Sequence, residues 1–211
     1  MAIDGSPSIH LRSLLDRQQY FDPHGAAARA GFSSGDWPLF GLLWPSARPL
    51  AARLAARALV PGERMLEIGC GLGLASLAAH RAGADVTASD SHPLAGRFLR
   101  ANLRLNDLIA LPYRHGPWAV NAHVPDGETA LSGRFELLFG SDLLYERDDS
   151  GRLAGFIGRH AAPRSEVWIV DPNRGNRPPF TRRMAQQGFT LAEERIQGPD
   201  YRGRWLVYQR D

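Results

Sequence analysis

The sequence predicts an α/β fold in which a mostly parallel sheet carries helices on both faces. Short apolar segments typical of strands alternate with segments typical of helices between residues 64 and 187. A glycine-rich turn follows the first of these strands, and two strand-like segments close the chain with no helix between them. Such alternation builds βαβ units with parallel strands, whereas the closing pair allows one antiparallel strand at an edge.

The first part of the chain is expected to form an arm ahead of the sheet. The predicted elements are a short helix or extended segment over residues 9–20, a loop over 31–37 and a helix over 46–59. The segment Asp22-Pro23-His24-Gly25 ends the first pattern, and Pro45 suits the first turn of a helix. We therefore expect residues 1–44 to be an arm that contributes to the site, and residues 45–211 to be the main domain.

The later elements follow in alternating order. Strands are predicted over residues 64–68, 85–89, 111–114, 135–140, 166–170, 189–196 and 204–209. Helices are predicted over residues 73–81, 93–105, 149–160 and 180–187. Gly83 and Gly188 lie just after two of these helices, where glycine commonly ends a helix. Residues 119–134 are predicted to form a polar loop or a hairpin.

The composition is that of a globular domain of ordinary size. The chain has 211 residues, of which 44% are hydrophobic and 22% are charged, so it can build a sizeable core. All 25 basic residues are arginine, so the chain carries no lysine side chain of its own. The formal net charge is only +3 and the arginines form no long run, so a nucleic-acid partner is not indicated.

Missing patterns argue against other classes of protein. The histidines lack the spacing of metal ligands, and no Gly-x-Ser-x-Gly turn occurs, so neither a metal site nor an α/β-hydrolase nucleophile is expected. Cys70 is the only cysteine, and we expect it to be a small packing residue rather than a nucleophile. No long apolar run and no signal-like start occur, so we expect no membrane partner and a cytoplasmic location.

The glycine turn after the first predicted strand is the most informative segment. It contains Gly69, Gly71 and Gly73, and Glu67 precedes it by two residues. Glycine permits positive φ and close approach of a ligand, and the next helix presents free N–H groups. A nicotinamide-binding turn would place its third glycine where this chain has Leu74. Because a carboxylate beside the turn repels a diphosphate but not a sulfonium, these residues favour S-adenosylmethionine over NAD.

A second acidic residue supports the same cofactor. Asp90 ends the predicted strand after the glycine turn, where an acid can accept hydrogen bonds from ribose hydroxyl groups. The glycines alone are weak evidence, and a solvated Asp90 beside an ordinary turn is the plain alternative. The glycines, Glu67 and Asp90 together, in this strand context, predict an S-adenosylmethionine site.

From about Trp44 onward, the sequence resembles the class I, seven-strand methyltransferases that use S-adenosylmethionine. Within that group it is similar to protein-lysine methyltransferases with a D-x-x-Y motif after the fourth strand, which here is Asp142-Leu-Leu-Tyr145. Bacterial relatives of the electron transfer flavoprotein β-subunit lysine methyltransferase resemble it most. The resemblance implies a Rossmann-like, seven-stranded, mostly parallel sheet with its last strand antiparallel.

Asp142 and Tyr145 follow a predicted strand, so they should face the cofactor cleft. The resemblance makes them the catalytic pair that receives a lysine amine. A lysine amine is neutral in roughly one molecule in 2,500 at pH 7, which corresponds to about 4.6 kcal/mol. A carboxylate attracts the ammonium but also favours its charged form, so Asp142 is predicted to orient the substrate. The alternative is that Asp142 caps a helix and Tyr145 only packs.

Tryptophans near both ends of the cleft are further candidates. The resembling family places a Trp-Pro element over the cofactor pocket, which here contains Trp44, and often has a tryptophan against the adenine, which here is Trp118. Both are predicted cofactor contacts, with core packing as the alternative, and Trp37 is expected to pack in the core. Asn102 and Asn106, on the next helix, are expected at the surface or at the helix end.

The loop Asp171-Pro-Asn-Arg174 follows the fifth strand and is expected to lie on the substrate side. Arg174 is expected either to approach an acidic partner or to be solvated. No proline lies between Asp142 and Tyr145, which disfavours enzymes that methylate bases or glutamine, because those often carry D-P-P-Y or N-P-P-Y there.

The predicted function is transfer of a methyl group to a lysine of a protein substrate, with the electron transfer flavoprotein β-subunit implied by the resemblance. One alternative is N-methylation of a small molecule or of another protein side chain. A second alternative is a non-catalytic protein that binds S-adenosylmethionine.

Overall fold

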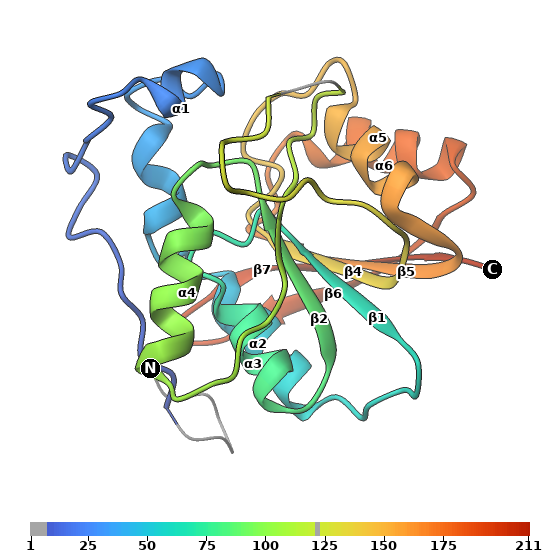
Figure 1. The fold of residues 1–211 in the computed structure, drawn as a ribbon. Coiled ribbons are helices and arrows are strands. Elements are labelled where there is room, and N and C mark those ends of the chain that lie inside the picture. The colour runs from blue at the N-terminus through green and yellow to red at the C-terminus, as the bar shows by residue number, and fades with distance from the viewer. Residues whose placement is uncertain (1–7, 121–122) are drawn as a thin grey trace.

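The computed structural model describes residues 8–120 and 123–211, and it contains a seven-stranded sheet with helices on both faces (Figure 1). The strands follow the order β3-β2-β1-β4-β5-β7-β6. Neighbouring strands from β3 to β5 pair in parallel, and β7 is antiparallel to both β5 and β6. The predicted fold, including the antiparallel last strand, is therefore confirmed.

The strands are β1 (Arg64–Ile68), β2 (Asp85–Asp90), β3 (Tyr113–His115), β4 (Phe135–Ser141), β5 (Ala161–Asp171), β6 (Thr190–Gln197) and β7 (Arg202–Arg210). The helices are α1 (Ala26–Arg29), the short 3-10 helix η1 (Trp37–Gly41), α2 (Ala47–Ala56), α3 (Leu74–Arg81), α4 (Ala95–Leu105), α5 (Arg152–His160) and α6 (Arg177–Gln186). Each predicted strand and helix from residue 46 onward has its counterpart here. None of the described helices is long and apolar enough to cross a membrane.

In the arm and in one loop, the structure decides between two predicted alternatives, and the arm also contains two short helices that were not predicted. No helix forms over residues 9–20, and the short helices lie later, in α1 and η1. The loop over 119–134 forms no hairpin in its described part, where His115 and Ala130 make an isolated parallel bridge. Residues 121–122 of that loop, and residues 1–7 of the expected arm, lie outside the described residues.

Side chains alternate between two cores, one on each face of the sheet. Met65, Leu137 and Phe139 pack in one core with residues of α2, α3 and α4. Leu66 and Leu138, the neighbours of those residues along the strands, pack in the other core with residues of α5 and α6. Because successive strand residues point to opposite faces, strands buried on both sides are apolar throughout, as β1 and β4 largely are.

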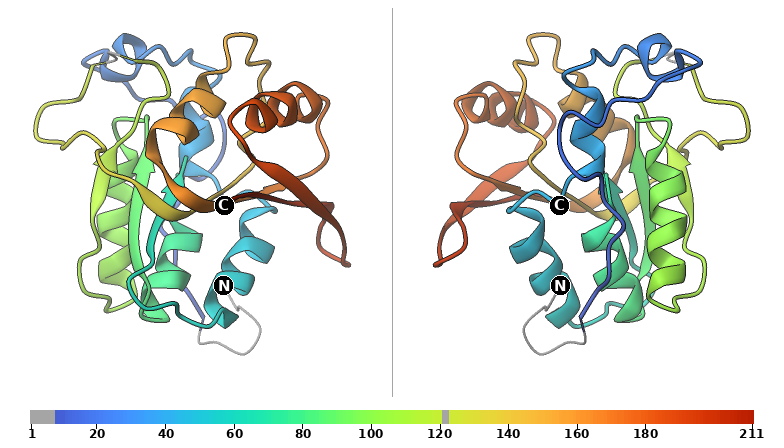
Figure 2. Two further views of the ribbon diagram at one scale, coloured as in Figure 1. Left: turned by 90° about the vertical axis from the view of Figure 1, so that its right-hand side faces the viewer. Right: turned by 90° about the vertical axis from the view of Figure 1, so that its left-hand side faces the viewer.

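The described part of the arm runs in an extended path beside α4, and the two side views show its course from residue 8 to α1 (Figure 2). The side-chain oxygen of Asn102 accepts a hydrogen bond from the Arg12 backbone N–H at 2.6 Å, and Asn106 bonds both backbone groups of His10. The Asn102 amide also donates to the Leu72 carbonyl at 2.9 Å. Asn102 is fully buried, so its predicted surface position is wrong, whereas Asn106 does end α4.

Candidate active site

A cavity of about 330 Å³ opens at the carboxyl ends of the parallel strands, where open α/β sheets bind ligands. Its walls come from the turns after β1, β2, β3, β4 and β5, and from the segment between α1 and α2. All nine predicted site residues line it: Trp44, Glu67, Gly69, Gly71, Gly73, Asp90, Trp118, Asp142 and Tyr145. Residues far apart in sequence thus meet around one space of a size suited to a small cofactor.

The glycine turn forms the floor of one end of the cavity. Gly69, Gly71 and Gly73 all have positive φ, a conformation that side chains other than glycine rarely adopt. A Cβ atom on Gly71 would lie 2.8 Å from the Phe40 carbonyl oxygen, which is closer than real contacts allow. The turn therefore requires glycine for its conformation and, at Gly71, for the close approach of η1.

Glu67 lies in β1, two residues before this turn, and it is buried, with 4% of its surface exposed. Its carboxylate accepts a hydrogen bond from the Ser76 backbone N–H at 2.9 Å, within α3. Burial raises the pKa of Glu67 to about 7, although the Ser76 bond opposes that rise. Near neutral pH this carboxyl group is only partly ionised, so the sequence argument that treats it as a full negative charge overstates its repulsion of a diphosphate.

Asp90 ends β2 and fixes the glycine turn to that strand. One carboxylate oxygen accepts the Gly71 N–H at 2.8 Å, and the other accepts the His92 N–H at 2.7 Å. Burial raises the pKa of Asp90, while these backbone bonds oppose the rise. Each carboxylate oxygen has a second lone pair, so Asp90 can accept further bonds from hydroxyl groups of a ligand.

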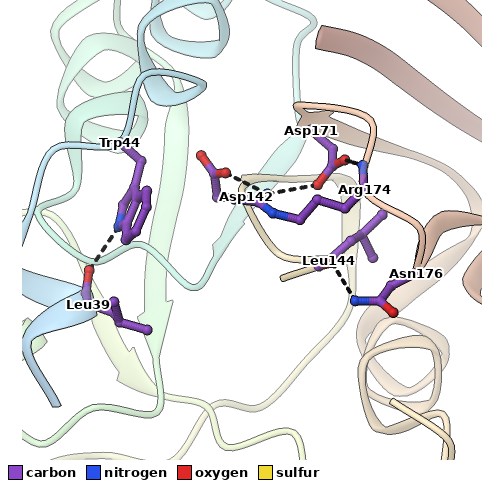
Figure 3. Close-up of polar contacts among 7 residues, drawn as sticks. All are labelled: Leu39, Trp44, Asp142, Leu144, Asp171, Arg174 and Asn176. Atoms are coloured by element: carbon purple, nitrogen blue, oxygen red, sulfur yellow. Dashed lines mark hydrogen bonds and ion pairs between the residues drawn. The ribbon is translucent and has the colours of Figure 1, made fainter. Parts of the chain in front are cut away.

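Aromatic side chains close the same end. The Trp44 indole N–H donates to the Leu39 carbonyl at 2.9 Å, which holds the ring at the wall of the cavity (Figure 3). Trp118, which follows β3, also lines the cavity. Trp37 does not line the cavity but packs edge-on against Phe40 and His92, in agreement with its expected place in the core.

Asp142 also lines the cavity, from the loop directly after β4. Its φ of 56° is left-handed, and the loop begins with the Asp142 N–H donating to the Val170 carbonyl at 3.0 Å. Since α5 begins only at Arg152, Asp142 caps no helix, and that alternative is wrong. Burial raises the pKa of Asp142, and a nearby arginine opposes the rise.

That arginine is Arg174, from the loop after β5. Its Nη1 lies 2.6 Å from Asp142 Oδ1 and 3.0 Å from Asp171 Oδ2, so the guanidinium joins two carboxylates (Figure 3). The second oxygen of Asp142 is shielded from water and has no hydrogen-bond partner among the described residues. Of the two expectations for Arg174, the acidic partner is confirmed, and that partner is a predicted catalytic residue.

Tyr145 is an exposed residue of the site, with 44% of its surface accessible to solvent. It lies beside Asp36, Asp90 and Glu146, and burial of its hydroxyl, followed by these negative charges, raises its pKa. Its phenol therefore stays protonated at physiological pH and can donate a hydrogen bond into the cavity.

Several cavity residues had no signal in the sequence. Phe40 lines the wall from η1 and stacks on His92, with ring centroids 3.8 Å apart. Burial lowers the pKa of His92 to about 3, so this imidazole is neutral. Contacts between the arm and the turn after β2 depend on the path of a segment without periodicity, which a sequence pattern does not specify.

The described residues hold no group of three or more histidine, cysteine, aspartate or glutamate side chains that could bind a metal ion. The sequence model of a methyltransferase domain family matches residues 45–207. The chain belongs to this methyltransferase family. It is an enzyme whose cofactor is S-adenosylmethionine, as the glycine turn and Asp90 predict.

Two curated relatives and one solved structure illustrate the similarity of this methyltransferase. The electron transfer flavoprotein beta subunit lysine methyltransferase of Xenopus laevis is 29% identical over 80% of this chain, which spans 64% of that protein. Protein N-lysine methyltransferase METTL21A of Mus musculus is 28% identical, over 75% of this chain and 73% of that protein. The structure of the Synechocystis magnesium protoporphyrin IX methyltransferase, solved with bound SAM, matches 79% of this chain and 78% of its own chain. The two are 19% identical and the TM-score is 0.61, so the similarity shows a shared fold.

Proposed function

We propose that this methyltransferase transfers a methyl group from S-adenosylmethionine to the side-chain amine of a lysine in another protein. The observation that carries the proposal is that Asp142 and Tyr145 line the same cavity as the glycine turn and Asp90. The curated relatives, whose names describe protein-lysine methyltransferases, support the same acceptor.

The glycine-turn end fits the cofactor. Gly71 allows the Phe40 carbonyl to approach the turn closely, and Asp90 keeps lone pairs for ribose hydroxyl groups. Trp44 and Trp118 provide flat apolar surfaces on the walls. We propose that these residues, with Glu67, Gly69 and Gly73, hold the cofactor.

At the other end, we propose that Asp142 and Tyr145 receive the acceptor. The Asp142 carboxylate orients the amine, and the Tyr145 hydroxyl bonds it or packs along the aliphatic stem. When bound, the cofactor supplies a methyl carbon to which the amine lone pair bonds as the carbon–sulfur bond breaks, its electron pair remaining on sulfur. The principal contribution of the protein is to hold the nitrogen in line with that bond.

The experiment uses purified protein, S-adenosylmethionine with a deuterated methyl group, and the electron transfer flavoprotein β-subunit of the same organism, followed by peptide mass spectrometry. We expect labelled lysine in the β-subunit. The chain contains no lysine, so every labelled lysine must come from the acceptor. A parallel reaction with cell extract covers other proteins.

The outcomes separate the alternatives. Label found only in small molecules, or on side chains other than lysine, would replace the proposed acceptor. Cofactor binding without label on any component of the extract would indicate a non-catalytic binding protein. The cytoplasmic location, the lack of a membrane or nucleic-acid partner and the division after residue 44 stay predictions.

A further inference from the structure

Three residues, Asp142, Arg174 and Asp171, form an ion-pair array beside the proposed acceptor position. Arg174 is 27% exposed, yet its guanidinium contacts both Asp142 and the fully buried Asp171. The Arg174 backbone N–H also donates to the other Asp171 oxygen at 2.7 Å. The Asn176 side-chain amide donates to the Leu144 carbonyl at 3.0 Å, which joins the loops after β4 and β5. The guanidinium is therefore held in place from two directions.

This array bears on a difficulty in methylating lysine. Only a neutral amine has the lone pair that attacks a methyl group, and a carboxylate beside the amine favours its charged form. Asp142 alone would bind the acceptor well but keep it protonated. A fixed cation next to the carboxylate reverses part of that effect, because a like charge disfavours the ammonium.

We propose that Arg174 is a positioning residue that holds Asp142 through one carboxylate oxygen and, by its positive charge, favours the neutral form of the acceptor lysine. This inference rests on the proposed function and deepens it. In Figure 3, Arg174 lies between the two aspartates, and the second oxygen of Asp142 lies on the side away from it, toward Trp44. That oxygen is buried and has no partner among the described residues, so its capacity to accept a hydrogen bond is unused before the amine binds.

Several other charged or titratable groups lie near Asp142 and Arg174. They are Asp36 from the arm, Asp90 from β2, Tyr145, Glu146 and Arg152 from the segment after β4, and Tyr201 before β7. Glu67, Cys70 and His92 lie at the glycine-turn end. Arg152 also lines the cavity, and its positive charge interacts with Glu146. Arg174 is the arginine that forms an ion pair with Asp142.

The first test compares the pH dependence of kcat for wild type, Arg174→Met and Arg174→Lys, with saturating cofactor and the electron transfer flavoprotein β-subunit. We expect the rise of kcat with pH to move upward by about one pH unit in Arg174→Met, which lowers kcat about tenfold at pH 7. The deficit should shrink at higher pH. Arg174→Lys keeps the charge and should restore much of the wild-type profile.

A merely structural role predicts a different result, namely an equal loss of kcat at every pH. That result, or a shift to lower pH, would overturn the proposal. Arg182→Met is the matched control, since Arg182 is exposed on α6 and lines neither the cavity nor the array, and it should keep the wild-type profile.

A second test does not require activity. The probe is n-butylammonium, a mimic of the lysine side chain, and its affinity at pH 7 is measured by NMR titration. Removing the cation should tighten binding several-fold in Arg174→Met while kcat falls, a split that simple disruption would not produce. Equal or weaker binding would overturn the proposal. Failure of the proposed function would instead appear as wild-type protein that labels no lysine.

Discussion

The two ends of the cavity are built from different kinds of group. At the glycine-turn end, the surface is backbone, and the carboxylates of Glu67 and Asp90 are buried and already bonded to backbone N–H groups. At the other end, the functional groups are side chains: an ion pair between Asp142 and Arg174, and the exposed ring of Tyr145. We therefore expect recognition of a ligand mainly by shape at the glycine turn and mainly by charge at Asp142 and Arg174.

This difference separates binding from transfer. Backbone groups fixed in a tight turn tolerate little change, because any added atom alters the shape that a ligand must fit. Charged side chains at the open end can change their protonation or pairing without altering that shape. Substitutions at the two ends should therefore affect different steps.

The largest effect is expected for Gly71→Val. Valine there would have an unfavourable positive φ, and its Cβ would meet the Phe40 carbonyl oxygen, so η1 must move. We expect no measurable binding of S-adenosylmethionine by calorimetry. Gly62→Val is the matched control, because Gly62 also has positive φ but has nothing within 4 Å of its would-be Cβ. Unchanged affinity in Gly71→Val would remove the proposed role of the turn.

Asp142→Asn should reduce transfer and spare binding. Asparagine tolerates the left-handed φ of Asp142, so the substitution removes charge with little backbone strain. We expect kcat/KM to fall about a hundredfold because the amine is no longer held in place, with cofactor affinity near that of wild type. Asp107→Asn, at another left-handed position, is the control. Equal loss of binding and transfer would place Asp142 at the cofactor instead.

A third effect concerns the stability of the fold at the glycine-turn end, rather than binding or transfer. The pKa of Glu67 rises from 4.5 to about 7 in the folded protein, so folding favours its protonated form. Protonation of Glu67 therefore contributes at most about 3 kcal/mol to the free energy of unfolding. This contribution is fully present below pH 4.5 and is lost as the pH rises through 7. In urea unfolding, Glu67→Gln should lose less stability than wild type between pH 5 and pH 8.

Glu194→Gln is the control for this pH dependence, because Glu194 lies at the surface with a side chain 70% exposed. It should follow the wild-type pH dependence. If Glu67→Gln did the same, Glu67 would be ionised in the folded state and the argument from its burial would be wrong.

The sequence predicted the sheet well because its strands and helices are regular. Strand β1 has the predicted bounds, and the apolar run of β4 reflects burial on both faces. The path of the arm was harder to predict from the sequence. Its aromatic residues Tyr20, Trp37 and Phe40 are positioned by contacts with one another and not by a periodic pattern in the sequence.

For the site, residue types and their positions at strand ends predicted nine residues that all line one cavity. Which side chains form ion pairs there could not be predicted from the sequence. The contact of Arg174 with Asp142 depends on two loops that meet only in three dimensions. Asn102 could have been found, because it lies three residues after the buried Leu99 and so faces the core on a helix. Its polar character suggested the surface, whereas in fact its amide is satisfied by backbone groups from two segments.

The Asn102 side-chain amide connects the arm to the glycine turn through hydrogen bonds. Asn102 bonds the arm at Arg12 and the glycine turn at Leu72, so ordering of the N-terminal segment and closure of the turn share one set of hydrogen bonds. A ligand that rigidifies the turn through these bonds must then also slow amide hydrogen exchange in the arm. By thermodynamic reciprocity, a change that loosens the arm must lower the affinity for that ligand by the same factor.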